Sequence, residues 1–166
     1  TQVYRMERDG KTVIRLTNEP NGVDGYDVSP ADGTVAYVTD NQLVLVGADG
    51  SNRHLLVDGG QTLYENNPQF FKDPLLNPVF SPDGQTIAYS HRGLDLYDIS
   101  SGASTLVLQG DVYGSPQYYS PVSYSPDGKK LLIEVGQWEA PPATAVYYPD
   151  TNTLAQSSQE QGFFCC

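Results

Sequence analysis

Short runs of aliphatic, aromatic and β-branched residues alternate along the chain with clusters of glycine, proline, aspartate and asparagine. The clearest example lies at 80–90, where an apolar residue leads into Ser81-Pro82-Asp83-Gly84 and the β-prone run Thr86–Ser90 follows. In such a turn proline presets φ for the first corner, aspartate tolerates the second, and glycine takes the positive φ with which an antiparallel strand begins. The stretch therefore predicts a β-hairpin.

The same turn is written three times, at 29–33, 81–84 and 125–128, and a β-prone run follows each copy. The copies recur at intervals of about 40–50 residues, which is the period of propeller blades made of four short strands. No segment shows the periodicity of a helix of ordinary length. The sequence therefore predicts an all-β, β-propeller-like fold of about three and a half four-stranded antiparallel blades.

We expect residues 1–166 to form a single propeller segment rather than separate domains. Its expected parts are a half blade at 2–17, blades at 25–58, 77–109 and 120–157, and a tail or the start of a missing blade at 158–166. An open arc of blades exposes unpaired strand edges and apolar faces. We therefore expect that the chain either is a fragment with additional blades in its parent or closes its ring by self-association.

The Ser-Pro-Asp-Gly hairpin, followed by a strand at 94–99 and another at 105–108, resembles the TolB-type β-propeller repeat, a WD-repeat-like unit common in bacterial proteins. It is also similar to the propellers that precede the catalytic domain in prolyl-oligopeptidase-type enzymes. The resemblance covers nearly the whole chain and implies a propeller fold and a bacterial, extracytoplasmic setting (periplasm or cell surface). It does not fix a function, because this fold carries binding modules, enzymes and scaffolds alike.

The charge balance is strongly acidic, with 9 lysines and arginines against 20 aspartates and glutamates and a formal net charge of −11. Nucleic acids and anionic membrane surfaces are bound through basic patches, and the chain has no cluster of lysine and arginine. The longest apolar run, Leu43–Val46, is too short to span a bilayer. We therefore expect neither a nucleic-acid partner nor a membrane span.

Catalytic and metal-binding patterns are weak. A serine triad needs a histidine beside its nucleophile, but we expect His54 to be a partly buried strand residue and His91 a solvated loop residue. The Asp-Gly pairs recur at turn positions, which indicates turn chemistry rather than calcium ligation. The adjacent Cys165 and Cys166 could bind a soft metal or form a strained disulfide, but packing in a further blade is favoured. We therefore predict that the chain is not an enzyme and holds no metal or cofactor.

Aromatic residues gather in the loops that should meet at one rim, where successive blades join and where the second strand of a blade turns into the third. The candidate ligand-binding residues on this rim are Tyr64, Phe70, Phe71, Tyr113, Tyr118, Tyr119 and Trp138, together with His91 and Arg92. Aromatic bodies beside asparagine, glutamine and aspartate suit recognition of a peptide or a glycan. The alternative is that several of these rings only cover the ends of blade interfaces. The loop at 59–77 is long for this fold, which favours a functional role.

These patterns predict a non-catalytic scaffold that recognises a protein or peptide on its aromatic rim. Three alternatives stay open: part of the substrate-gating propeller of a prolyl-oligopeptidase-type hydrolase, a glycan-binding propeller, and an array of blades with no ligand of its own.

Overall fold

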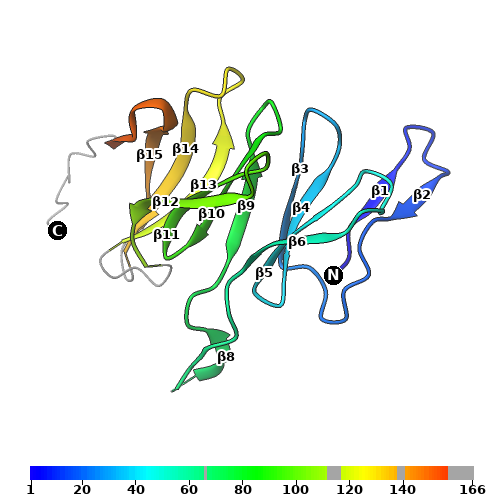
Figure 1. Cartoon of the computed structure of the whole chain (residues 1–166), viewed down its shortest axis with the longest axis horizontal. Coiled ribbons are helices and arrows are strands. Elements are labelled where there is room, and N and C mark those ends of the chain that lie inside the picture. Colours follow the sequence, from blue (N-terminus) through cyan, green and yellow to red (C-terminus); the bar gives the residue numbers. More distant parts are fainter. Residues whose placement is uncertain (66, 112–116, 138–140, 157–166) are drawn as a thin grey trace, which may run out of the picture.

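The structure is a computed structural model, and it describes residues 1–65, 67–111, 117–137 and 141–156. Almost every element is a β-strand (Figure 1). The strands are β1 (Tyr4–Met6), β2 (Val13–Arg15), β3 (Gly25–Val28), β4 (Val35–Thr39), β5 (Gln42–Val46), β6 (His54–Asp58), β7 (Leu63–Tyr64), β8 (Asn67–Phe71), β9 (Leu76–Phe80), β10 (Thr86–His91), β11 (Gly93–Asp98), β12 (Ala103–Gln109), β13 (Tyr118–Tyr124), β14 (Leu131–Gly136), β15 (Ala143–Tyr148) and β16 (Thr153–Gln156), with a 3₁₀ turn η1 (Pro149–Thr151). No helix in the described ranges is long and apolar enough to cross a membrane.

Consecutive strands pair into antiparallel meanders, three of which have four strands. We call these sheet 1 (β3–β6), sheet 2 (β9–β12) and sheet 3 (β13–β16). The hairpins β1–β2 and β7–β8 form separate two-stranded sheets. The sheets follow one another in sequence order from the N-terminus towards the C-terminus, and each packs on the next (Figure 1).

The central strands are buried on both faces, which explains their nearly continuous apolar runs. All five residues of β4 are buried, and alternate side chains of this strand serve different neighbours. Val35 and Tyr37 pack towards Val3 and Leu16 at the N-terminal end of the chain. Ala36 and Val38 face sheet 2. A strand that points successive side chains to opposite faces can in this way join two interfaces.

Each interface has its own apolar cluster. The one between sheets 1 and 2 contains Leu43 and Leu45 from sheet 1 and Phe80, Ile87 and Tyr89 from sheet 2. The cluster between sheets 2 and 3 consists of Ala88, Leu94, Leu131, Ile133, Val135, Ala145 and Tyr147. The core is therefore a series of layers between sheets rather than one shared centre.

The turns at 81–84 and 125–128 are held by their own serine and aspartate side chains. The Ser81 hydroxyl donates to Oδ1 of Asp83 over 2.6 Å and accepts the Thr86 amide over 2.9 Å. Ser125 repeats the arrangement with Asp127 (2.6 Å) and the Lys130 amide (3.0 Å). The expected positive φ is confirmed at the turn glycines Gly33, Gly84 and Gly128. These contacts give a physical reason for serine and aspartate in the motif, since each satisfies turn groups that would otherwise need water.

The structure differs from the sequence prediction in three places. The stretch 59–77, expected as a loop, contains the hairpin β7–β8, and the first strand of sheet 3 begins at Tyr118 instead of near 121. The exposures of the two histidines are the reverse of those predicted. His54 is exposed on β6, whereas His91 ends β10 and is only 8% exposed.

Candidate binding rim

The two ends of the sheets carry different kinds of connection. The Ser-Pro-Asp-Gly turns lie at the top of Figure 1, coloured blue, green and yellow, and the β7–β8 hairpin extends from the opposite end. We call the first end the turn rim and the second the loop rim, which is formed by the β4–β5 turn, the β10–β11 turn and residues 59–75. The predicted binding residues concern the loop rim.

The long inter-sheet segment on the loop rim is fixed at its base by one buried side chain. Asn41, 2% exposed in the β4–β5 turn, donates from Nδ2 to the carbonyl oxygens of Gly60 (2.8 Å) and Asp73 (3.2 Å). Its Oδ1 accepts the amide of Leu75 over 2.7 Å, and its own carbonyl accepts the amide of Gly59 over 2.9 Å. Both ends of the segment are therefore tied to the same residue, and the hairpin projects from a fixed base.

The hairpin presents apolar and aromatic side chains. Leu63 pairs with Phe71, and Tyr64 with Asn67. Phe70 is 47% exposed, while Tyr64 and Phe71 are half-buried. Partial burial and the negative charges of Asp111 and Asp73 raise the pKa of Tyr64, so its phenol stays protonated. The hairpin therefore offers an apolar surface with a hydroxyl group on the same small element.

His91 and Arg92 lie at the β10–β11 turn, but only Arg92 is exposed. The Arg92 carbonyl accepts the amide of Gly110 over 3.1 Å, which ties the turn to the start of the next inter-sheet loop. His91 is buried at the end of β10, and its Nδ1 has no hydrogen-bond partner in the described part of the chain. Burial, followed by the nearby Arg92 charge, lowers the pKa of His91, so the ring is neutral at neutral pH. The prediction of a solvated histidine is wrong, because β10 continues to His91.

Asp95, which the sequence analysis missed, is buried below this turn. It pairs with Tyr89 across β10 and β11, is 7% exposed, and has no partner for Oδ2 among the described residues. Burial raises its pKa to about 6, and the Arg92 charge opposes the increase. The alternation of Leu94, Asp95 and Leu96 is the pattern of a strand with one solvated face, so the sequence carried no signal of a buried carboxyl group.

Tyr118 and Tyr119 come together in a cleft of about 240 Å³ between sheets 2 and 3. The cleft is also lined by Leu76, Asn77, Ser90, Ser120 and Glu134. Two side-chain hydrogen bonds join residues that line it, from Ser90 Oγ to the Tyr119 carbonyl (2.6 Å) and from Asn77 Nδ2 to Ser120 Oγ (2.8 Å). The cleft thus combines two aromatic rings with a carboxylate and several hydroxyl and amide groups.

Part of this aromatic surface has a packing role. A Cβ at Gly136 would overlap the ring of Tyr118, and one at Gly110 would come within 2.9 Å of the Tyr119 ring. The Tyr119 hydroxyl donates to Oε1 of Gln117 over 3.2 Å. Both rings therefore cover backbone at the ends of strands as well as lining the cleft. The other two predicted aromatic residues, Tyr113 and Trp138, lie outside the described residues.

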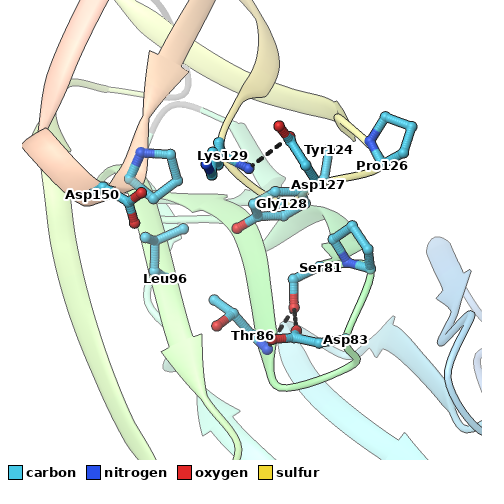
Figure 2. A pocket seen from close by; sticks show the side chains of 12 residues that line it. Ser81, Asp83, Thr86, Leu96, Tyr124, Pro126, Asp127, Gly128, Lys129 and Asp150 are labelled. Carbon is cyan, nitrogen blue, oxygen red and sulfur yellow. Dashed lines mark hydrogen bonds between the residues drawn. The ribbon is translucent and has the colours of Figure 1, made fainter.

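A second, larger cavity lies at the turn rim, where the sequence analysis placed no site (Figure 2). It has a volume of about 570 Å³ and separates the turn of sheet 2, at Ser81 and Asp83, from the turn of sheet 3, at 124–129. No signal could have revealed it, since the turns are far apart in sequence and become neighbours only when the sheets stack.

The described residues contain no metal-binding group of side chains, and the exposed histidine makes only a local contact. Across the described ranges no group of three or more histidine, cysteine, aspartate and glutamate side chains is arranged to hold a metal ion. His54 Nδ1 lies 3.0 Å from the carbonyl oxygen of Asn52, a local contact on an exposed strand. Cys165 and Cys166 lie outside the described residues. That the chain is not an enzyme stays a prediction.

Solved structures of low sequence identity share the fold. TolB from Acinetobacter baumannii superposes with a TM-score of 0.68 at 15% identity, over 93% of this chain and 37% of that chain. The nidogen/laminin complex gives 0.64 at 11% identity, over 93% of this chain and 57% of the matched one. Porphyromonas gingivalis dipeptidyl peptidase 4 superposes with a TM-score of 0.59 at 13% identity, over 93% of this chain and 28% of that chain. The chain therefore has a β-propeller fold, as the sequence predicted, and sheets 1 to 3 are its blades.

Curated relatives of similar sequence are fungal peptidases. The chain is 28% identical over 160 residues to a probable dipeptidyl-peptidase 5 of Aspergillus clavatus, and the match covers 96% of this chain. It is also 28% identical over 133 residues to dipeptidyl-peptidase 5 of Aspergillus fumigatus, with 68% of this chain covered. The chain spans only 18% of the length of either relative. No protein-family profile matches the chain, so the particular repeat type and the bacterial source stay predictions.

Proposed function

We propose that this chain is the propeller segment of a dipeptidyl-peptidase-like protein and that it recognises a peptide or protein segment on its loop rim without cleaving it. The observation that carries the proposal is the similarity to dipeptidyl-peptidase 5 along 96% of the chain, matched to only 18% of that relative. The matched part carries a cleft with two tyrosine rings, which supports a role in presenting a substrate.

The geometry of the loop rim supports peptide recognition. The hairpin on its Asn41 base holds an exposed Phe70, and the Tyr118–Tyr119 cleft places rings beside Glu134 and Asn77. Extended peptides are bound by apolar contacts for alternate side chains and by polar groups for the backbone. The rim supplies both on elements that are fixed to the blades.

A second candidate is an independent module that recognises another protein. The TM-score of 0.68 to TolB and the similarity to a propeller solved in the nidogen/laminin complex favour it. Both candidates use the loop rim and differ in what accompanies the propeller. A glycan ligand stays an alternative for the same cleft.

The test is capture of peptides by the purified chain. We expect immobilised chain to retain a reproducible subset of a casein digest, identified by mass spectrometry, and to lose most of this retention on Phe70→Ala. Leu55→Ala is the matched control, because Leu55 is also 47% exposed but lies on the outer strand β6. Equal retention by Phe70→Ala and the parent chain would exclude the hairpin from recognition.

A further inference from the structure

The cavity at the turn rim is a groove whose two walls come from equivalent turns of neighbouring blades. One wall is formed by Ser81, Asp83 and Thr86 of sheet 2, and the other by Tyr124 and the turn 126–129 of sheet 3 (Figure 2). Its volume of about 570 Å³ lies within the range of sites that hold drug-sized ligands. Both walls belong to four-stranded sheets of the described part of the chain.

The carboxylates on the walls are fixed in place. Oδ1 of Asp83 accepts the Ser81 hydroxyl (2.6 Å) and the Gln85 amide (3.0 Å). Asp127 makes the same two contacts, with Ser125 (2.6 Å) and the Lys129 amide (3.1 Å). The hydrogen bond from serine is the main cause that lowers the pKa of each aspartate, so both are anionic across the physiological range. A fixed carboxylate loses little side-chain entropy when it binds a cation.

Charge in the groove is predominantly negative. Asp150 in η1 adds a third carboxylate, and Lys129 is the one cation among the described lining residues. The whole chain has the same sign, with a formal net charge of −11. The groove is therefore complementary to a positively charged partner, and it disfavours phosphate groups, nucleic acid and a second copy of this acidic chain.

The floor of the groove is apolar and contains one buried hydroxyl. Leu96 lies at one end, and the Tyr124 ring lies between the two walls (Figure 2). That hydroxyl is buried and has no hydrogen-bond partner in the described part of the chain. Burial is the main cause that raises the Tyr124 pKa, and Asp83 adds to it, so the phenol remains a hydrogen-bond donor.

The groove continues outward along the blade interface. A second cavity of about 480 Å³ shares Thr86, Leu96 and Pro149 with it and reaches the outer strand β12. Asp98 lies on this extension. The two cavities thus adjoin at shared residues, and both have carboxylates in their lining, which suits an extended chain better than a compact ligand.

We infer that this groove binds an extended basic segment of a partner protein. One arginine or lysine of the segment places its aliphatic part over Tyr124 and Leu96 and its cation among Asp83, Asp127 and Asp150. Long basic side chains have this dual character, because an apolar stem carries a charged head. The site lies at the opposite end of the blades from the loop rim, so it is independent of the function proposed above.

Two labelled peptides and the full chain test the inference. The probe is a short fluorescein-labelled peptide with one central arginine among alanines and glycines, and its partner has citrulline at that position. Fluorescence polarisation at low ionic strength should show saturable binding of the arginine peptide and about fivefold weaker binding of the citrulline peptide. No binding of the arginine peptide, or equal affinities, would overturn the inference.

Variants of opposite expected effect separate binding from folding. Asp150→Asn should weaken binding of the arginine peptide about threefold, and Lys129→Ala should strengthen it by a similar factor. Asp32→Asn is the control. Asp32 has in sheet 1 the turn position that Asp83 and Asp127 have in sheets 2 and 3, but it lies outside the groove. An unchanged affinity in Asp150→Asn, or an equal loss in Asp32→Asn, would also contradict the inference.

Discussion

The side-chain oxygen of Asn41 accepts the backbone amide of Leu75 over 2.7 Å, across 34 residues of sequence. The same side chain donates to the carbonyl oxygens of Gly60 and Asp73. A single residue in the β4–β5 turn thus satisfies backbone groups at both ends of the hairpin segment. Buried backbone groups need such partners, so the position of the hairpin depends on Asn41.

Asn41→Ala should therefore lower the free energy of unfolding by about 1–3 kcal/mol, because it leaves the buried Leu75 amide and two partly buried carbonyl groups without their partner. Urea denaturation of the purified chain measures the effect. Asn21→Ala is the control, since Asn21 is exposed and its side chain donates a hydrogen bond to Asp40. A loss in Asn41→Ala no larger than that in Asn21→Ala would show that the segment is held by other contacts.

Tyr37 donates its buried hydroxyl to Oε1 of Glu19 over 2.6 Å, and Arg53 donates to the same carboxylate over 2.7 Å. The hydrogen bond from Arg53 is the main cause that lowers the pKa of Glu19, so Tyr37 bonds to an anion. Tyr147 instead donates its hydroxyl to the neutral side chain of Asn152. Tyr37→Phe should therefore lower the free energy of unfolding by about 1 kcal/mol more than Tyr147→Phe does. Equal unfolding free energies of the two variants would contradict this account.

Asp95 predicts an unusual pH dependence of stability. Its pKa is raised to about 6 in the folded chain, above the ordinary value near 3.8, because the carboxyl group is buried. The folded state therefore binds the proton more tightly than the unfolded state. The stability that Asp95 contributes to the folded state is fully present below the pKa that Asp95 has in the unfolded chain. It is lost as pH rises through about 6.

Asp95→Asn removes this titration. Relative to the parent chain, we expect the variant to gain up to about 3 kcal/mol between pH 4 and pH 8 in urea denaturation. His91 changes stability in the opposite direction. Its pKa in the folded chain is lowered from the ordinary value of 6.5, so the folded state loses stability as pH falls below 6.5. His91 is present in both proteins, so the difference between them isolates Asp95. A difference that does not change with pH would place Asp95 in contact with solvent or a cation.

Loss of the serine of the turn motif should lower the free energy of unfolding more where that serine is more deeply buried. Ser81 is buried and Ser125 only half-buried, although both make the same pair of hydrogen bonds. Ser81→Ala should lower the unfolding free energy by about 1–2 kcal/mol, and Ser125→Ala by less. Thermal denaturation followed by circular dichroism compares them, and a larger loss in Ser125→Ala would contradict the assignment of the effect to burial.

Local chemistry made the blades predictable. Proline, aspartate and glycine encode the turns at Gly33, Gly84 and Gly128 in a few adjacent residues, and the repeated turns gave the fold. The environments of individual residues were less accessible. His54 and His91 exchange the exposures expected of them, because exposure depends on where a strand ends and on which sheet covers it.

Features that join distant segments were not visible in the sequence. The Asn41 base links residues far apart in the chain, the burial of Asp95 depends on the packing around β11, and the groove beside Tyr124 needs two blades. The β7–β8 hairpin was missed because Pro68 interrupts the β-prone run and no glycine turn separates its strands. The loop rim was recognisable from its aromatic residues, but their division between packing and cleft required the structure.

We propose that the chain binds peptides without cleaving them. The most direct measurement incubates the purified chain with a casein digest and follows, in one sample, both retention of peptides and release of dipeptides by mass spectrometry. We predict retention that falls on Phe70→Ala but not on Leu55→Ala, and no dipeptide above a control without the chain. Dipeptides that accumulate with time in proportion to chain concentration would contradict the claim.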